Sequence, residues 1–204
     1  MESWSTIPQF TQIVTVNANN LLKTKKDMGD VSVNDILIKA VANVVADYPI
    51  VNSTLENDEV LIYDGINVSV AMLTEKGLIV PVVRNVGNKS VNQVSQEIRE
   101  LSARAQNNEL TVGDFANGTI TVSNLGPYGI ECGTPIINSP QSTIVFIGSI
   151  NKVPVINEQD EVEIGSVMRL SIGYDHRFID GATAAGFTSR VKQAIENVSA
   201  DKLS

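Results

Sequence analysis

Apolar residues recur at intervals of three and four in three parts of the chain, which is the spacing of amphipathic helices. The first predicted helix follows Ser32, which has Asp35 at capping-box distance, and ends before Pro49. The second begins at Ser90 with the same signal, and the third begins within residues 180–183. Their apolar positions are Val33, Ile36, Leu37, Ala40, Val41, Val44 and Val45; Val91, Val94, Ile98, Leu101 and Ala105; and Phe187, Val191, Ala194, Ile195 and Val198.

Between these helices the pattern changes to short apolar or alternating runs bounded by turn residues, which is typical of strands. Strands are predicted at residues 59–63, 67–73, 77–83, 119–123, 143–150 and 167–174. Residues 104–110 are polar enough for a surface connection, and residues 199–204 are expected to be a loose tail. The pattern contains no repeat and no linker, so residues 1–204 are expected to form one α/β domain with helices covering a sheet.

The chain carries a net charge of −8, which disfavours nucleic acid and anionic membrane surfaces as partners. No apolar run reaches the about 18 residues of a membrane-spanning helix, and the start of the chain lacks the basic-then-apolar pattern of a secretory signal. The single cysteine, Cys132, cannot form an intrachain disulfide and suits a reducing compartment. We therefore expect a cytoplasmic protein without a nucleic-acid or membrane partner.

His176 is the only histidine, so any imidazole base in this chain must be this residue. It begins the pattern His-x-x-x-Asp-Gly, in which Asp180 can orient the ring or cap the last predicted helix. Gly181 is expected to occupy a tight backbone position that tolerates little else. Asp175 and Arg177 flank the histidine and are expected to form a structural ion pair, because a guanidinium stays protonated and is a poor general base.

Residues 175–182 (Asp-His-Arg-Phe-Ile-Asp-Gly-Ala) resemble the signature of the acyltransferase (E2) core of 2-oxo-acid dehydrogenase complexes. The wider chloramphenicol acetyltransferase superfamily shares the His-x-x-x-Asp-Gly part. Further segments resemble the same family in the same order: 7–11, with Gln9 where histidine is frequent, 77–83, 123–126, and 133–140, with Ser139 in place of a proline. The resemblance implies a chloramphenicol acetyltransferase-like two-layer sandwich, in which helices cover a mixed sheet.

The resemblance also implies acyl transfer between S-acyl-dihydrolipoamide and coenzyme A, in a 2-oxo-acid or acetoin dehydrogenase complex. His176 would be the general base, supported by Asp180, and Ser123 matches the hydroxyl that stabilises the tetrahedral oxyanion. No covalent acyl-enzyme is needed, because a deprotonated thiol is itself a good nucleophile. Relatives with a serine at the position of Ser123 usually handle acetyl or branched-chain acyl groups, whereas succinyl-specific relatives often have threonine there. Of these groups we favour acetyl, and the sequence leaves the branched-chain alternative open. The resemblance implies no metal.

Family positions that contact coenzyme A fall here on Lys25, Ser32, Asn124 and Gly148, and we expect these residues to bind it. Lys25 belongs to the basic cluster at residues 23–26, which could equally be a solvated helix end. An anionic ligand would need such a local cluster, because the chain as a whole is acidic.

The resemblance further implies a homotrimer with active sites between subunits, assembled into a 24-mer or 60-mer cage. The lipoyl group would come from a separate domain, and the other partners would be the decarboxylase and dihydrolipoamide dehydrogenase components. Complete E2 chains carry lipoyl and subunit-binding modules upstream of the core. None of these 204 residues resembles such a module, so we expect an excised core or a stand-alone relative.

Three other interpretations stay open at the level of sequence. A related coenzyme A-dependent acyltransferase could act on a small hydroxyl or amine, and a scaffold core could assemble without catalysis. Cys132 could also be a nucleophile paired with His176, although single cysteines are more often buried and inert. Ser123 itself could be only a turn residue, because it follows a predicted strand and precedes Asn124 and Gly126.

Overall fold

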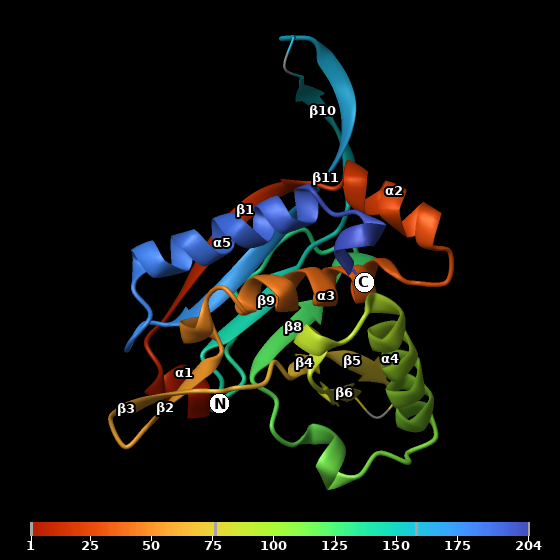
Figure 1. The fold of residues 1–204 in the computed structure, drawn as a ribbon. Coiled ribbons are helices and arrows are strands. Elements are labelled where there is room, and N and C mark those ends of the chain that lie inside the picture. The colour runs from red at the N-terminus through yellow and green to blue at the C-terminus, as the bar shows by residue number, and fades with distance from the viewer. Residues whose placement is uncertain (1, 76, 158, 204) are drawn as a thin grey trace.

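Seven strands form the main sheet of the computed structural model, which describes residues 2–75, 77–157 and 159–203 (Figure 1). The strands are β1 (Gln9–Asn17), β4 (Val68–Val70), β7 (Val82–Val83), β8 (Ile120–Asn124), β9 (Thr143–Ile147), β10 (Asn151–Ile156) and β11 (Val162–Asp175). Their order is β1-β11-β9-β8-β4-β7, and β10 pairs with the first part of β11. Two further hairpins are formed by β2 (Ser53–Glu56) with β3 (Glu59–Ile62) and by β5 (Met72–Thr74) with β6 (Gly77–Ile79).

The sheet is mixed, as predicted, because β8 runs parallel to its neighbours β4 and β9 while the other pairs are antiparallel. Its register places Ser123 of β8 beside Phe146 of β9, and Phe146 beside Ser171 of β11. Ser123 and Ser171 therefore lie level with each other, two strand spacings apart.

Helices cover one face of this sheet (Figure 1). They are α2 (Asn19–Met28), α3 (Val33–Val45), α4 (Val91–Gln106) and α5 (Gly181–Glu196), and a short α1 (Glu2–Thr6) precedes β1. Single 3-10 turns are η1 (Pro49–Val51), η2 (Val86–Asn88), η3 (Val112–Phe115), η4 (Gly126–Tyr128) and η5 (Ala200–Leu203). Both predicted capping boxes are confirmed, because the side chains of Ser32 and Ser90 accept from the backbone N–H groups of Asp35 and Gln93.

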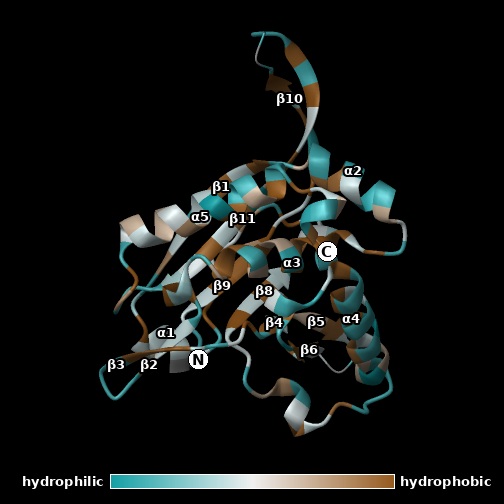
Figure 2. Cartoon of the chain, in the orientation of Figure 1, coloured by the Kyte–Doolittle hydropathy of each residue, from teal (hydrophilic) through white to brown (hydrophobic). Residues whose placement is uncertain are grey.

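The main core lies between the sheet and the helices, with α3 at its centre. Figure 2 shows hydrophobic residues concentrated on α3, whose sides face the sheet and the neighbouring helices. Even Lys39 of α3 is buried, and its ammonium donates to the carbonyl oxygens of Val86 and Gly87 at 3.3 and 3.1 Å. Burial lowers the pKa of Lys39, and the two carbonyl oxygens replace part of its lost hydration.

The other face of the sheet is partly covered by residues 126–138. Gly133 lies against the ring of Phe146, and Ile137 packs with Ile7 and Ile144 in a second, smaller core. At the start of this segment the backbones approach very closely: a Cβ on Gly148 would lie 1.9 Å from the carbonyl oxygen of Glu131. The loop can therefore cover the ends of β8 and β9 only if position 148 is glycine.

Most predicted elements are confirmed, and the differences have local causes. The predicted strands 67–73 and 77–83 are each divided, into β4 and β5 and into β6 and β7. The second division falls at Val80 and Pro81, where proline cannot donate to a strand ladder. The predicted strand 167–174 is the inner part of a longer β11, whose outer part forms a projecting arm with β10 (Figure 1).

Two predictions about surface segments need correction. The predicted connection at 104–110 is confirmed for residues 107–110, but its first three residues belong to α4, which continues to Gln106. The predicted loose tail instead forms η5, and Leu203 is only 1 % exposed because it joins the main core. An apolar residue near the end of a chain can thus fix a segment whose composition is polar. Ser204 lies outside the described residues.

The Gly148 contact predicts a specific sensitivity. Gly148→Ala should lower the free energy of unfolding by about 1–3 kcal/mol, because backbone rather than a flexible side chain occupies the space. Urea unfolding followed by circular dichroism measures this loss. Gly113→Ala is the control, since the first atom its Cβ would meet is a Thr111 oxygen at 3.6 Å. Equal stability of the two variants would contradict this account of the loop.

Candidate active site

His176 lies immediately after β11, in an exposed turn. Its backbone N–H donates to the carbonyl oxygen of Pro8 at 2.8 Å, which ties the turn to the start of β1. Its ring packs on the ring of Phe10, with centroids 4.6 Å apart, and Phe10 in turn stacks on Tyr174 at 5.4 Å. The imidazole therefore has one side supported by an aromatic ring, while the residue as a whole is open to solvent.

Asp180 is the N-cap of α5, and its carboxylate accepts from the backbone N–H of Thr183 at 2.7 Å. This hydrogen bond is the main reason that the pKa of Asp180 is lowered, and the nearby imidazole of His176, when protonated, contributes in the same direction. The capping role predicted for Asp180 is confirmed. The carboxylate consequently stays ionised close to the imidazole.

The expectation for Gly181 is wrong within this chain. A Cβ added at Gly181 would have no atom within 4 Å, and the φ angle of Gly181 is not positive. Gly181 is the first residue of α5, where the backbone is helical and the side chain would point into open space. No strained conformation therefore explains the glycine of this motif.

Asp175 and Arg177 form the predicted ion pair. Arg177 donates to both carboxylate oxygens of Asp175, with a shortest distance of 2.6 Å, and its backbone N–H also donates to the carboxylate. The hydrogen bond to Asp175 raises the pKa of Arg177. Because Asp175 is 1 % exposed, this pair fixes the turn that carries His176.

Ser123 lies at the end of β8 and is half-buried. Next to it, Asn124 donates to the side-chain oxygen of Asn34 at 3.2 Å and accepts from the backbone N–H of Gly126 at 2.9 Å. The first contact joins the end of β8 to the first turn of α3, which Ser32 caps. The structure thus gathers Ser123, Asn124 and Ser32 at one end of the sheet.

The two remaining residues predicted to contact coenzyme A lie around this end and have structural roles of their own. The Lys25 ammonium donates to the carbonyl oxygen of Gly29 at 2.6 Å, at the end of α2 and three residues before Ser32. Gly148 is buried under the backbone of Glu131. Asn34 completes the group, and sequence reasoning missed it because it lies inside the capping box of α3.

Within one chain, Ser123 and His176 lie far apart. Ser123 is level with Ser171, with β9 between them, and β11 continues four more residues to Asp175 before His176 follows. At about 3.3 Å per residue and about 4.8 Å between strands, Asp175 is already roughly 16 Å from Ser123. The side chains also differ in face: Ser123 shares the face of Phe146, whereas His176 packs on Phe10 at the side that α5 covers.

The alternative pair of Cys132 and His176 is not formed within the chain either. The residue after Cys132, Gly133, donates to the Ser171 hydroxyl at 3.4 Å. His176 comes five residues later along β11, which corresponds to roughly 16 Å. Cys132 itself is half-buried and forms no disulfide.

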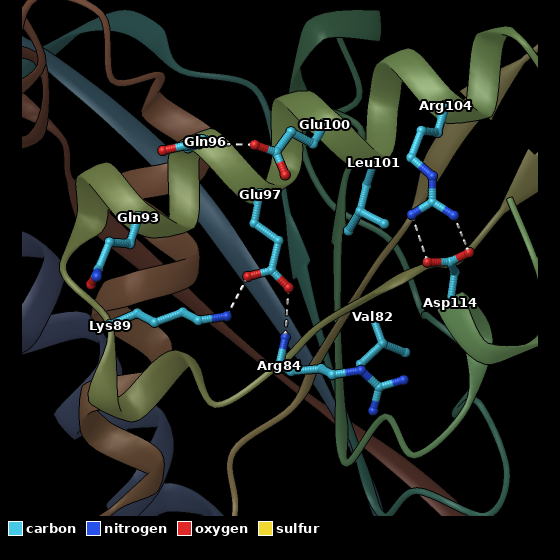
Figure 3. A pocket seen from close by; sticks show the side chains of 10 residues that line it. All are labelled: Val82, Arg84, Lys89, Gln93, Gln96, Glu97, Glu100, Leu101, Arg104 and Asp114. Atoms are coloured by element: carbon cyan, nitrogen blue, oxygen red, sulfur yellow. Dashed lines mark hydrogen bonds and ion pairs between the residues drawn. The ribbon is translucent and has the colours of Figure 1, made fainter. Parts of the chain in front are cut away.

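A cavity of about 420 Å³ lies elsewhere, between α4, β7 and η3 (Figure 3). Its charged groups largely neutralise one another: Lys89 pairs with Glu97, and Arg104 pairs with Asp114 at 2.6 Å. The hydrogen bond from Arg104 holds the pKa of Asp114 far below its ordinary value. None of the predicted site residues lines this cavity.

The described part of the chain contains neither a metal-binding cluster nor a membrane-spanning helix. No cluster of three or more histidine, cysteine, aspartate or glutamate side chains is arranged to hold a metal ion among residues 2–75, 77–157 and 159–203. Over the same ranges, no helix has the length and apolar character needed to cross a membrane.

Comparison with known proteins places the whole chain in one family. Residues 1–201 match the model of the 2-oxoacid dehydrogenases acyltransferase catalytic domain. The chain is 36 % identical over 206 aligned positions to the dihydrolipoyllysine-residue acetyltransferase component of the pyruvate dehydrogenase complex of Rickettsia bellii. That alignment covers 97 % of this chain and 49 % of the relative, so the chain spans about half the length of the curated relative.

Solved structures agree. A probable dihydrolipoamide acetyltransferase from Listeria monocytogenes has a TM-score of 0.91 and 33 % identity, covering 97 % of this chain and 88 % of its own. The cubic core of a pyruvate dehydrogenase multienzyme complex has a TM-score of 0.89 and 30 % identity, covering 96 % and 84 %. Chloramphenicol acetyltransferase, at 19 % identity and a TM-score of 0.59, covering 100 % and 94 %, shares the fold.

One further structure concerns catalysis. The dihydrolipoamide acetyltransferase of Azotobacter vinelandii has a TM-score of 0.89 and 29 % identity, and the match covers 96 % of this chain and 84 % of that one. It was investigated for the role of one serine, one histidine and one asparagine in its catalytic mechanism, the asparagine lying four residues after the histidine.

The Asp175–Arg177 pair generates a stability prediction. Arg177→Met should lower the free energy of unfolding by about 2–4 kcal/mol, because it leaves a buried carboxylate without its partner. Arg190→Met is the matched control: Arg190 and Asp47 are both more than half exposed and their atoms are 4.0 Å apart, so its effect should stay within about 0.5 kcal/mol. Urea unfolding measures both, and equal losses would remove the special role of the buried pair.

Proposed function

The chain belongs to the family of 2-oxoacid dehydrogenase acyltransferase catalytic domains, and we propose that it transfers an acyl group, acetyl by preference, between S-acyl-dihydrolipoamide and coenzyme A. The observation that carries the proposal is the family match over residues 1–201, combined with the presence of His176, Asp180 and Ser123. The proposed setting is a cytoplasmic 2-oxo-acid or acetoin dehydrogenase complex, in which a separate domain supplies the lipoyl group and the decarboxylase and dihydrolipoamide dehydrogenase are partners.

His176 acts as the general base in this proposal. Its neutral imidazole accepts the proton of the attacking coenzyme A thiol, and the thiolate sulfur forms a bond to the thioester carbonyl carbon. The Ser123 hydroxyl donates a hydrogen bond to the oxygen that becomes negative in the tetrahedral intermediate. When the carbon–sulfur bond to dihydrolipoamide breaks, the imidazolium returns its proton to the leaving thiolate.

The residues around Ser123 fit the proposed coenzyme A. Ser32 is exposed and Asn124 is half-buried, so both can offer polar atoms at the end of β8. Lys25 and its neighbours Lys23 and Lys26 supply positive charge for the phosphates of the ligand, in a chain whose net charge is −8. Gly148 keeps the backbone there close-packed. We propose that coenzyme A binds at these residues.

The Azotobacter enzyme supports the assignment of the three catalytic positions. Here a serine, Ser123, also precedes the motif histidine at nearly the same separation, and Asp180 stands four residues after His176 where that enzyme has asparagine. Either residue can cap a helix by accepting from the backbone N–H of the third residue after it. The aspartate of this chain adds a negative charge beside the imidazole.

Within one chain, Ser123 and His176 are too far apart to act on the same atoms of a substrate. We propose that each active site forms between neighbouring subunits of a homotrimer, and that trimers assemble into a 24-mer or 60-mer cage. The arm supports association, because one face of its ribbon presents Pro154, Ile156, Val162 and Ile164, and the last three are 72, 75 and 78 % exposed. The similar cubic core of a pyruvate dehydrogenase complex supports it as well.

The first functional test is product formation from a panel of acyl-dihydrolipoamides with coenzyme A. Acetyl-dihydrolipoamide should give the fastest turnover, and His176→Ala should lower kcat by at least ~10²-fold because the thiol loses its base. Cys132→Ala is the control and should retain kcat. Absence of acyl-coenzyme A from the folded wild-type chain with every donor would refute the proposed function, and an inactive Cys132→Ala protein would favour the cysteine nucleophile.

A mixing experiment tests the shared site. His176→Ala and Ser123→Ala proteins, each inactive, are dissociated, mixed equally and reassembled. For random mixing, about a quarter of the interfaces should combine an intact His176 with an intact Ser123, and activity should recover to about that fraction of wild type. Subunit exchange verified by mass spectrometry, without recovered activity, would place the site within a single chain.

A further inference from the structure

Three polar side chains form a continuous hydrogen-bonded chain behind the turn that carries His176. The Thr188 hydroxyl donates to the Gln12 side-chain oxygen at 2.8 Å, and the Gln12 amide donates to the carbonyl oxygen of Gly181 at 3.1 Å. The Tyr174 hydroxyl lies 2.7 Å from the Thr188 hydroxyl and 3.3 Å from the carbonyl oxygen of Ala184. We name these three residues the polar clamp: Gln12, Thr188 and Tyr174.

The donor and the acceptor in each hydrogen bond of the polar clamp follow from counting protons. Thr188 has one hydroxyl proton, which goes to Gln12, so the one phenolic proton of Tyr174 is shared between the Thr188 oxygen at 2.7 Å and the carbonyl oxygen of Ala184 at 3.3 Å. Tyr174 is fully buried, and burial raises its pKa, so the phenol keeps the proton that this bond needs. Every member of the polar clamp is therefore satisfied, and each depends on its neighbour.

The polar clamp joins the three elements that surround His176. Tyr174 lies on β11 two residues before His176, and Gln12 lies on β1 two residues after Phe10, the ring on which His176 packs. Thr188 and the two acceptor carbonyls belong to α5, whose N-cap is Asp180. The bond from Gln12 to Gly181 holds the residue directly after that cap.

We propose that Gln12, Thr188 and Tyr174 are positioning residues for the proposed acyl transfer, because they fix the first turn of α5, and with it Asp180, relative to the His176 ring. The inference rests on the proposed function of His176. None of the three touches the reacting atoms. Their effect is to keep the Asp180 carboxylate at a fixed distance from the imidazole. This distance affects kcat but not the free energy of unfolding.

Thr188→Val tests the polar clamp by exchanging a hydroxyl for a methyl group of the same shape. We expect kcat to fall about tenfold, because misplacement of catalytic groups by less than an ångström is sufficient for such a loss, while KM for both substrates stays within about twofold. Thr188→Ser keeps the hydroxyl and should restore kcat to within about twofold of wild type.

Thr24→Val is the matched control. Thr24 is 5 % exposed and Thr188 is 6 % exposed, and the Thr24 hydroxyl donates to the carbonyl oxygen of Val198, away from the motif. Both variants lose a buried hydroxyl, so both should lose similar stability, but only Thr188→Val should lower kcat. Gln12→Glu is a second variant that removes the donor to Gly181 while keeping an acceptor for Thr188, and it should lower kcat without raising KM.

The outcomes separate this inference from the proposed function. An inactive wild-type protein would refute the function itself. An active wild type and an inactive His176→Ala variant, together with Thr188→Val and Thr24→Val proteins of equal kcat, would overturn the positioning role alone. If Thr188→Val does not fold, an unchanged kcat in Gln12→Glu would overturn it equally.

Discussion

The placement of β9 between β8 and β11 is the constraint on which the rest of this structure depends. Backbone pairing fixes the spacing between strands and the register along them, so no side-chain rearrangement can bring the end of β8 to the end of β11. Ser123 and His176 sit at these two ends and on different faces of the sheet. A single chain therefore holds the two groups of the proposed active site at separate places, called half-sites, and chemistry that uses both groups needs a second copy.

The two half-sites are built by different means. At the His176 end, an ion pair, an aromatic stack and a helix cap restrict a short turn that is open to solvent. At the Ser123 end, backbone packs on backbone: the loop after β8 lies against Gly148, and Asn124 ties the strand to α3. The first end presents an imidazole that is open to solvent, and the second presents fixed polar groups around a hydroxyl, which fits the proposed roles of base and oxyanion donor.

Much of this could be predicted from the sequence, because local signals coincided with the final contacts. The capping serines Ser32 and Ser90 marked helix starts correctly, and the motif at 175–182 marked the ion pair and the cap of α5.

Features that depend on the tertiary structure could not be predicted from the sequence. β1 and α2 lack a strong apolar period because each buries few residues, Val16 in β1 and Leu21 and Thr24 in α2. Leu203 is buried only through contact with distant residues. Gly181 was misjudged because the motif suggested strain that the helical backbone does not have. The polar clamp could not be seen in the sequence, since its members are brought together only by the pairing of β1 with β11 and by the packing of α5.

The separation of the half-sites can be tested most directly by crosslinking. In a Cys132→Ala background, Ser123→Cys and His176→Cys are made in separate proteins, which are mixed, reassembled and treated with a thiol reagent whose span is shorter than the roughly 16 Å expected within one chain. The account predicts a covalent dimer that forms only after mixing, with peptides containing positions 123 and 176 joined in mass spectra. A single chain carrying both cysteines that crosslinks as a monomer, with no covalent dimer in the mixture, would contradict it.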